Sequence, residues 1–234
     1  VYGVTDVPRP DRFSRVNTFL HVNHEPRRPR YGVLLCINGT GILNAWVKKT
    51  TVPDMSYPEV NRRCAEIPVG SEGVLMLPFG NGAERMLGNR YTGAEAIGLD
   101  LNRHDRFHLL RAAQEGIAFA FRYGMDVMRE TGLRLRVIRA GYANLFLSPV
   151  FRQTLATLCG ADIELYNTDG ALGAARGAAL GAGLYASREE TFASLRKIEV
   201  RPDPADRDVL ERGYARWKAE LENRLGRASH GTSV

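Results

Sequence analysis

The sequence contains few cysteines, and they neither pair nor cluster. Only three occur among 234 residues, at Cys36, Cys64 and Cys159. An odd number of widely spaced cysteines argues against a disulfide framework. No cysteine lies at ligand spacing from a histidine, so we predict no metal site. Cys36 and Cys159 lie in the apolar stretches VLLCIN and TLCGAD. These two positions predict buried thiols in a reducing compartment, and therefore a cytoplasmic protein.

Long apolar runs and clustered charge of one sign are also absent from the sequence. No apolar stretch reaches the roughly 20 residues that a helix needs to span a bilayer. The formal net charge is +6, but the basic residues are scattered and only four of the 32 are lysines. The one local basic cluster, PRRPR at 26–30, contains prolines that indicate a loop. Because nucleic-acid-binding domains concentrate basic charge on one face, we predict neither a nucleic-acid partner nor a membrane segment.

Two common nucleotide-binding signatures are missing as well. The absence of GxxxxGK[ST] excludes a P-loop, and the absence of GxGxxG after a strand excludes a dinucleotide oxidoreductase. The first residues, VYGVTDVPRP, include no initiating methionine and no signal-peptide pattern. This beginning suggests that the chain is an excerpt of a longer one.

What the sequence does contain is a regular alternation of strand-like and helical patterns, which predicts an α/β layer fold. Strand patterns cover residues 16–24, 31–38, 73–79, 133–141 and 162–166. Helical patterns cover residues 42–49, 57–67, 106–131 and 149–158. The first two strand patterns predict an antiparallel hairpin inside a mixed sheet.

Two long helices have clear apolar stripes. In the helix predicted over 106–131, apolar residues recur at helical spacing and Gln114 is the polar exception. A second helix is predicted to begin at Asp203-Pro204, and we expect it to dock on the core of the chain or on a partner such as a second copy. We predict a disordered tail over 227–234. The stripe of the second helix consists of Leu210, Tyr214, Trp217 and Leu221.

Four stretches, taken in order, resemble the C-terminal domain of the FGGY family of carbohydrate kinases, in particular the xylulose kinases. They are GVLMLPFGNGAERM (73–86), IGLDLNRHDRFHLLRAAQEGIAFAF (97–121), AGYANLFLSPVFRQTLATLCG (140–160) and DGALGAARGAALGAG (169–183). The resemblance runs from about residue 14 to residue 186. It implies an actin-like ATPase (ribonuclease H-like) fold, a single domain over 1–202 whose mixed sheet is flanked by helices. The amphipathic helix 203–226 would pack on this domain.

The stretch INGTG (37–41) predicts a loop on the phosphate side of a nucleotide site. Gly39, Thr40 and Gly41 are the candidate contacts of this loop: the two glycines allow close approach of the backbone, and the helix predicted over 42–49 presents free N–H groups to an anion. The resemblance implies that Gly41 matches the family glycine that lines the nucleotide phosphates. The alternative interpretation is an ordinary turn between a strand and a helix.

A second candidate segment follows the strand pattern that ends at Gly141, the position where α/β sheets bind ligands. Gly141 would leave bare backbone against an adenine, and the Ser148 hydroxyl could bond the base or the ribose. Tyr142 or Phe146 either stack on the base or pack within the loop. The segment departs from the family pattern, because Ala140 replaces a glycine and six residues separate Gly141 from Ser148.

Three glycines spaced four residues apart, Gly173, Gly177 and Gly181, lie in an Ala- and Gly-rich helical stretch. They are compatible with a membrane helix interface, a nucleotide loop or a helix packed closely on another element. Phosphate loops carry their glycines before the helix rather than along it. We therefore predict that these glycines form a bare face against a neighbouring element.

Two charged pairs complete the set of candidate residues. Arg111 and Glu115 are four apart on the long helix, which predicts a structural ion pair. Glu84 and Arg85 follow the turn GNG, and the resemblance implies that their loop borders an interdomain cleft. They are candidates for substrate-side or hinge residues.

The resemblance implies an ATP-dependent sugar kinase that uses Mg²⁺, with D-xylulose as the first candidate substrate. In this family the catalytic Asp and most of the sugar site lie upstream, and no Asp of this sequence has the corresponding context. We therefore expect no catalytic residue and no metal ligand in this chain, no activity of the chain alone, and an adenine nucleotide as its own ligand. The alternative is a non-catalytic scaffold with a degenerate actin-like fold.

Overall fold

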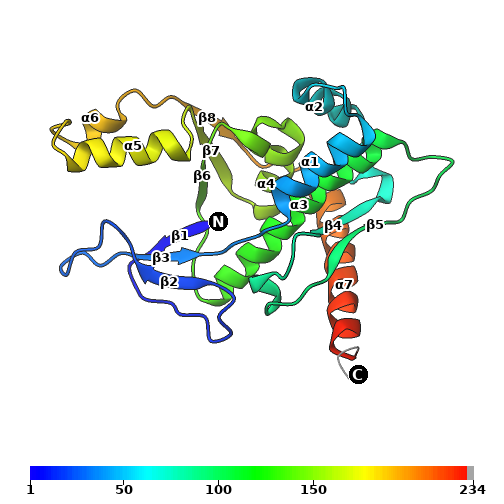
Figure 1. Ribbon diagram of the computed structural model, residues 1–234, viewed down its shortest axis with the longest axis horizontal. Helices are drawn as coiled ribbons and strands as arrows, with labels where there is room; N and C mark the ends of the chain where they lie inside the picture. The colour runs from blue at the N-terminus through cyan, green and yellow to red at the C-terminus, as the bar shows by residue number, and fades with distance from the viewer. Residues whose placement is uncertain (231–234) are drawn as a thin grey trace.

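The computed structural model describes the backbone of residues 1–230 and the side chains of residues 1–227. The longest helix, α3 (Arg106–Glu130), crosses the molecule (Figure 1). It begins where the Asp105 carboxylate accepts the N–H groups of Phe107 and His108, a capping arrangement that satisfies two free donors. It ends before Gly132, whose φ of +86° is available to glycine at little cost. The helix predicted over 106–131 is confirmed.

The N-terminal strands form an antiparallel sheet of their own (Figure 1). Its strands are β1 (Tyr2–Thr5), β2 (Asn17–Leu20) and β3 (Tyr31–Leu34), and β3 is the central one. The pairing of β2 with β3 confirms the predicted hairpin, although the hairpin is not hydrogen-bonded to the mixed sheet described below. β1 was not predicted from the sequence, because a four-residue strand beside loop residues has too little pattern to recognise.

The middle of the chain packs helices and a strand pair on α3. α1 (Thr40–Thr51) and α2 (Tyr57–Glu66) follow β3, and Ser56 caps α2 by accepting the N–H of Glu59. β4 (Leu75–Phe79) pairs antiparallel with β5 (Gly93–Ile97), and every residue of β4 is buried. The short helices η1 (Ser71–Gly73) and η2 (Arg85–Leu87) flank β4.

The third sheet is the mixed one. β6 (Val137–Gly141) runs parallel to β7 (Asp162–Tyr166), and β7 pairs antiparallel with β8 (Lys197–Val200). The short helix η3 (Asn144–Leu147) and α4 (Pro149–Cys159) make the crossover from β6 to β7. This crossover places the carboxyl end of β6 beside α4 and the segment that follows β7, where the candidate site lies.

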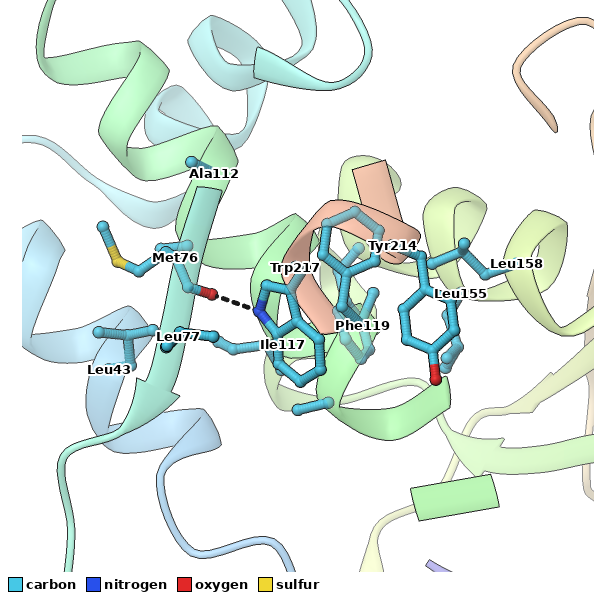
Figure 2. Packing of buried hydrophobic residues seen from close by; sticks show 14 of the residues in the cluster. Leu43, Met76, Leu77, Ala112, Ile117, Phe119, Leu155, Leu158, Tyr214 and Trp217 are labelled. Carbon is cyan, nitrogen blue, oxygen red and sulfur yellow. Dashed lines mark hydrogen bonds between the residues drawn. The ribbon is translucent and has the colours of Figure 1, made fainter. Parts of the chain in front are cut away.

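The last helix, α7 (Arg207–His230), packs its apolar stripe on the core of the chain. Leu210, Tyr214, Trp217 and Leu221 are all buried, as the 4, 3, 4 spacing predicts. Figure 2 shows Trp217 among buried residues of α3, α4 and β4, where its indole N–H donates to the Met76 carbonyl at 2.8 Å. The stripe therefore serves intramolecular packing rather than a partner.

The prediction that the glycines of 169–183 pack against a neighbouring element is wrong within this chain. They lie on α5 (Gly170–Gly181), which has no buried residue. A Cβ added at Gly173, Gly177 or Gly181 would meet nothing within 4 Å. α5 packs on the short helix α6 (Arg188–Phe192), and the two lie to one side of the main body (Figure 1). The spacing of the glycines predicts a helix face without side chains, but it does not show that another element packs on that face.

Two further expectations are corrected at the C-terminus and at the cysteines. Residues 227–230 belong to α7 rather than to a tail, and residues 231–234 lie outside the described part. Cys36 is exposed, because it directly follows the fully buried Leu35 in extended chain and alternate side chains point to opposite sides. Cys159 is buried as predicted, and so is Cys64; burial raises the pKa of both thiols to about 12. Over the described residues, no helix combines the length and apolar character needed to cross a membrane.

A pair of glycine-to-alanine variants tests the close packing of α3 on β4. A Cβ at Gly116 would lie 2.1 Å from the Met76 carbonyl oxygen, whereas a Cβ at Gly177 meets open space. We expect Gly116→Ala to lower the free energy of unfolding by about 1–3 kcal/mol through overpacking. We expect Gly177→Ala to raise helix stability by about 0.5–1 kcal/mol. Urea denaturation of both variants measures the difference, and a shift of the same sign in both would contradict the packing argument.

Candidate functional site

A cavity of about 760 Å³ opens where the carboxyl end of β6 meets the first turns of α1 and α5. Its size is typical of pockets that bind small molecules. Its walls come from segments that are distant in the sequence, and they consist of Thr40, Gly41, Asn44, Tyr57, Asn61, Phe121, Ala140, Gly141, residues 143–148, Phe151, Asp169 and Gly170.

The cavity brings together five of the seven candidate contacts from the sequence analysis, namely Thr40, Gly41, Gly141, Phe146 and Ser148. Thr40 and Gly41 lie at the start of α1, and Gly141 and Ser148 lie at the two ends of the loop that contains η3. Gly141 is a glycine for a local reason, since a Cβ there would lie 2.3 Å from the Thr168 carbonyl oxygen. This close contact lets the end of β6 pass directly beside the segment that leads into α5.

Gly39 and Tyr142, the other two, do not line the cavity. A Cβ at Gly39 would lie 1.8 Å from the Pro78 carbonyl oxygen, so Gly39 faces the end of β4 instead. Tyr142 is partly exposed, and the Arg152 guanidinium lies 5.7 Å from the centre of its ring. Phe146 does line the cavity, and its ring packs edge-on against Phe151 at a centroid distance of 5.3 Å.

Two helix N-termini face the cavity, and they differ in their capping. α1 begins at Thr40 without a side-chain cap, so its first N–H groups have no side-chain acceptor. α5 is capped by Asp169, whose carboxylate accepts the Leu172 N–H at 2.8 Å. Free N–H groups and the helix dipole favour an anion at such an end. No lysine or arginine is among the lining residues, all of which belong to the described chain. An anion bound here would therefore depend on neutral donors, which are the backbone N–H groups at the start of α1 and the hydroxyl and amide groups of the lining.

A short chain of polar side chains connects one wall of the cavity to the core. The Ser148 hydroxyl donates to Gln114 Oε1 at 2.5 Å, and Gln114 Nε2 donates to Asn61 Oδ1 at 3.3 Å. Ser148 also caps α4 by accepting the Phe151 N–H. Gln114 is nearly fully buried, and its hydrogen bonds with Ser148 and Asn61 satisfy its side-chain amide. They explain why one polar residue interrupts the apolar stripe of α3. That interruption was the sequence signal for this wall, whereas Asn44 and Asn61 carry no motif that would have indicated them.

The charged candidates lie outside the cavity. Glu84 is fully buried, and its carboxylate accepts the N–H groups of Asn38 and Gly39, just before α1. Burial raises the pKa of the Glu84 carboxyl, and these two N–H donors oppose the rise. Arg85 points the other way, because its Nε donates to the Ser14 carbonyl at 2.7 Å.

Arg111 and Glu115 form the ion pair predicted by their spacing, with 2.7 Å between Arg111 Nε and Glu115 Oε1. Both side chains are buried, and burial raises the pKa of Glu115 in spite of its partner. Glu115 also accepts from Gly70 N and Ser71 Oγ, and Arg111 donates to the carbonyls at the end of α2. The pair therefore ties α3 to α2 and η1, a structural role.

Residues 8–186 match the FGGY family of carbohydrate kinases, C-terminal domain. This chain belongs to that family. Among curated relatives it is 34% identical over 179 residues to the xylulose kinase of Haemophilus influenzae and 31% identical over 173 residues to the L-xylulose/3-keto-L-gulonate kinase of Escherichia coli. These matches cover 72% and 70% of the chain but only 35% and 33% of the relatives, so the chain spans about a third of their length.

Solved structures of such kinases share the fold. The xylulose kinase from Rhodospirillum rubrum superposes with a TM-score of 0.80 at 24% identity, covering 97% of this chain and 46% of that one. The Plasmodium falciparum glycerol kinase with ADP gives a TM-score of 0.71 at 21% identity, covering 90% of this chain and 42% of that one. These likenesses confirm the actin-like ATPase fold that the resemblance implied.

The buried ion pair allows a test of the structural role of α3. We expect Arg111→Met to lower the free energy of unfolding by about 3–5 kcal/mol, because it leaves the Glu115 charge buried without a partner. The loss should shrink as the pH falls toward 4.5, the ordinary pKa of a Glu carboxyl, since the raised pKa lets the folded state take up a proton first. Urea denaturation at several pH values measures this. A small loss that does not change with pH would contradict the assignment.

Proposed function

We propose that this chain is the nucleotide-binding half of an ATP-dependent sugar kinase, with D-xylulose as the acceptor. The observation that carries the proposal is that Gly41 and Gly141, from distant parts of the sequence, line one cavity at the carboxyl end of β6. Ligands of open α/β sheets bind at that end. Membership in the carbohydrate kinase family and relatives called xylulose kinase support the reaction class and the sugar.

In this proposal the adenine lies among the walls formed by Tyr57, residues 143–148 and Phe151, and the phosphates lie at the uncapped start of α1. Apolar and aromatic walls with a few polar groups suit a nucleoside, and the free N–H groups of Thr40 and Gly41 suit phosphate oxygens. The domain comprises residues 1–202, and the helix that begins after Asp203 packs on it.

Magnesium is expected to accompany ATP, because it neutralises charge on the phosphates during phosphoryl transfer. Mg²⁺ is commonly held by phosphates and one or two carboxylates rather than by an all-protein cage. Within the described residues, no group of three or more His, Cys, Asp or Glu side chains could hold a metal ion. Magnesium held mainly by the phosphates is compatible with this arrangement. In this proposal the base for the sugar hydroxyl and the sugar site lie outside this chain.

The glycine at the start of α1 gives the sharpest test of nucleotide binding. A Cβ at Gly41 meets nothing within 4 Å, so Gly41→Ala should fold as the wild type does. If phosphates occupy the space in front of Gly41, the added methyl group should weaken ATP binding by about tenfold, the factor that corresponds to about 1.4 kcal/mol. Titration with a fluorescent ATP analogue, competed by ATP, measures both proteins.

Gly173→Ala is the matched control, because its Cβ also meets open space but lies on α5 beyond the cavity lining. Wild-type affinity in Gly41→Ala would place the phosphates elsewhere. A wild-type chain that fails to bind ATP would reject the nucleotide-binding role and favour a non-catalytic scaffold.

The chain alone should bind nucleotide without transferring phosphate, because the base that activates the sugar hydroxyl lies outside it in this proposal. We expect no production of ADP above background when the purified chain is incubated with ATP, Mg²⁺ and D-xylulose. Gly41→Ala, purified in the same way, measures the background from contaminating kinases. Production of ADP that depends on D-xylulose and falls in Gly41→Ala would overturn this part of the proposal.

A further inference from the structure

The Glu84 carboxylate is buried without a cation to pair with. Its residue is 0% exposed, and none of the ion pairs formed among the described residues involves it. A buried charge is costly unless hydrogen bonds compensate it. The compensation comes from the backbone: Asn38 N lies 3.0 Å and Gly39 N lies 3.2 Å from Glu84 Oε1, and Asn38 N also lies 3.2 Å from Oε2.

Glu84 is itself held rigidly by its own loop. Its N–H donates to the Arg90 carbonyl, and its carbonyl accepts the N–H groups of Leu87 and Asn89, which closes the turn around η2. Asn38 adds two further links to this loop: its side chain donates to the Ala83 carbonyl at 3.3 Å, and its carbonyl accepts the Asn81 amide at 3.3 Å. The carboxylate is therefore a fixed acceptor rather than a mobile surface group.

The residues that Glu84 holds come immediately before the start of α1. Gly39 is enclosed between the Glu84 carboxylate and the Pro78 carbonyl, where even a Cβ would not fit. The next two residues, Thr40 and Gly41, line the cavity. Since the N–H groups of Asn38 and Gly39 are already bound by Glu84, the N–H groups that can face a ligand begin at Thr40.

We propose that Glu84 is a positioning residue for the phosphates of the nucleotide: by holding Asn38 and Gly39 from behind, it sets the orientation in which Thr40 and Gly41 present their N–H groups. The proposal rests on the proposed function of the cavity. In this proposal Glu84 does not touch the ligand. Arg85 has a different role, because its side chain donates to the Ser14 carbonyl in the N-terminal loop.

The test compares ATP with adenosine, which occupies the same cavity without phosphates. We expect Glu84→Ala to weaken ATP binding by about tenfold, because the loop before α1 loses a charge-assisted hydrogen bond. Adenosine binding should weaken by less than about twofold. Glu84→Gln keeps one acceptor oxygen in place and should recover part of the ATP affinity. Calorimetric titration of the folded proteins gives both constants.

Glu115→Gln is the matched control, because Glu115 is also buried and also accepts a backbone N–H, that of Gly70, away from the cavity. This variant should be less stable than the wild type, because Arg111 loses its charged partner, but the ATP affinity of the folded protein should equal that of the wild type. Hydrogen exchange supplies a second measurement for Glu84→Gln, in which the amides of Asn38 and Gly39 should exchange faster than in the wild type. This measurement remains available if Glu84→Ala fails to fold.

Equal losses of ATP and adenosine affinity in Glu84→Ala, or unchanged exchange at Asn38 and Gly39 in Glu84→Gln, would overturn the positioning role. In those cases the wild type still binds ATP, so the proposed function stands. Failure of the wild type to bind ATP would reject both proposals together.

Discussion

The carbonyl oxygen of Met76 lies at the point where the core elements of this chain come closest. It accepts the indole N–H of Trp217 from α7, and the missing side chain of Gly116 allows α3 to pack directly against it. One buried strand group thus contacts both α3 and α7. Two residues further on, the Pro78 carbonyl lies against Gly39 and so carries the same constraint to the start of α1. The position of the cavity follows from the packing of β4.

The chemistry of the cavity depends on backbone groups more than on charged side chains. The chain carries 28 arginines, yet the cavity lining includes none of them. Instead, the uncapped start of α1 supplies N–H donors, and the buried Glu84 holds that start from behind. A site of this kind recognises an anion by fixed dipoles, which need little reorganisation when the ligand binds. This arrangement is the one that the proposed nucleotide-binding role requires at the phosphates.

Much of the fold could be predicted from the sequence, because its main helices have strong periodic patterns. The apolar stripes of α3 and α7 predicted which faces of these helices are buried, and the alternating stretch DIELY predicted β7 with its observed bounds. β1, β5 and β8 were missed because they are short and almost none of their side chains is buried, so they carry little apolar pattern. Cys36 was misplaced because an apolar neighbourhood does not show on which side of an extended chain a residue lies.

The candidate site was predictable in part for similar reasons. Turns after strands indicated Gly41 and Gly141. The strands before them, β3 and β6, belong to different sheets, so it is the tertiary packing that brings the two turns to one cavity. Asn44 and Asn61 could not be found, since polar residues on helices are common and only the tertiary structure shows which of them face a cavity. The polar chain behind Ser148 left one visible trace, Gln114 within an apolar stripe. The prediction for the glycines of α5 was wrong because their spacing shows only that they share one face of the helix. It does not show whether another element packs on that face.

The two helices that border the cavity, α1 and α5, differ in how firmly the rest of the chain holds them. A helix of 12 residues is marginal in water even with good helix formers, and glycine weakens it further. α1 rests on α3 and β4, whereas α5 has no buried residue to hold it. Its first residues, Asp169 and Gly170, nevertheless form one side of the cavity. If α5 frays, that side of the cavity loosens while the side formed by α1 keeps its shape, so a contact that stabilises α5 from outside would also stabilise the cavity.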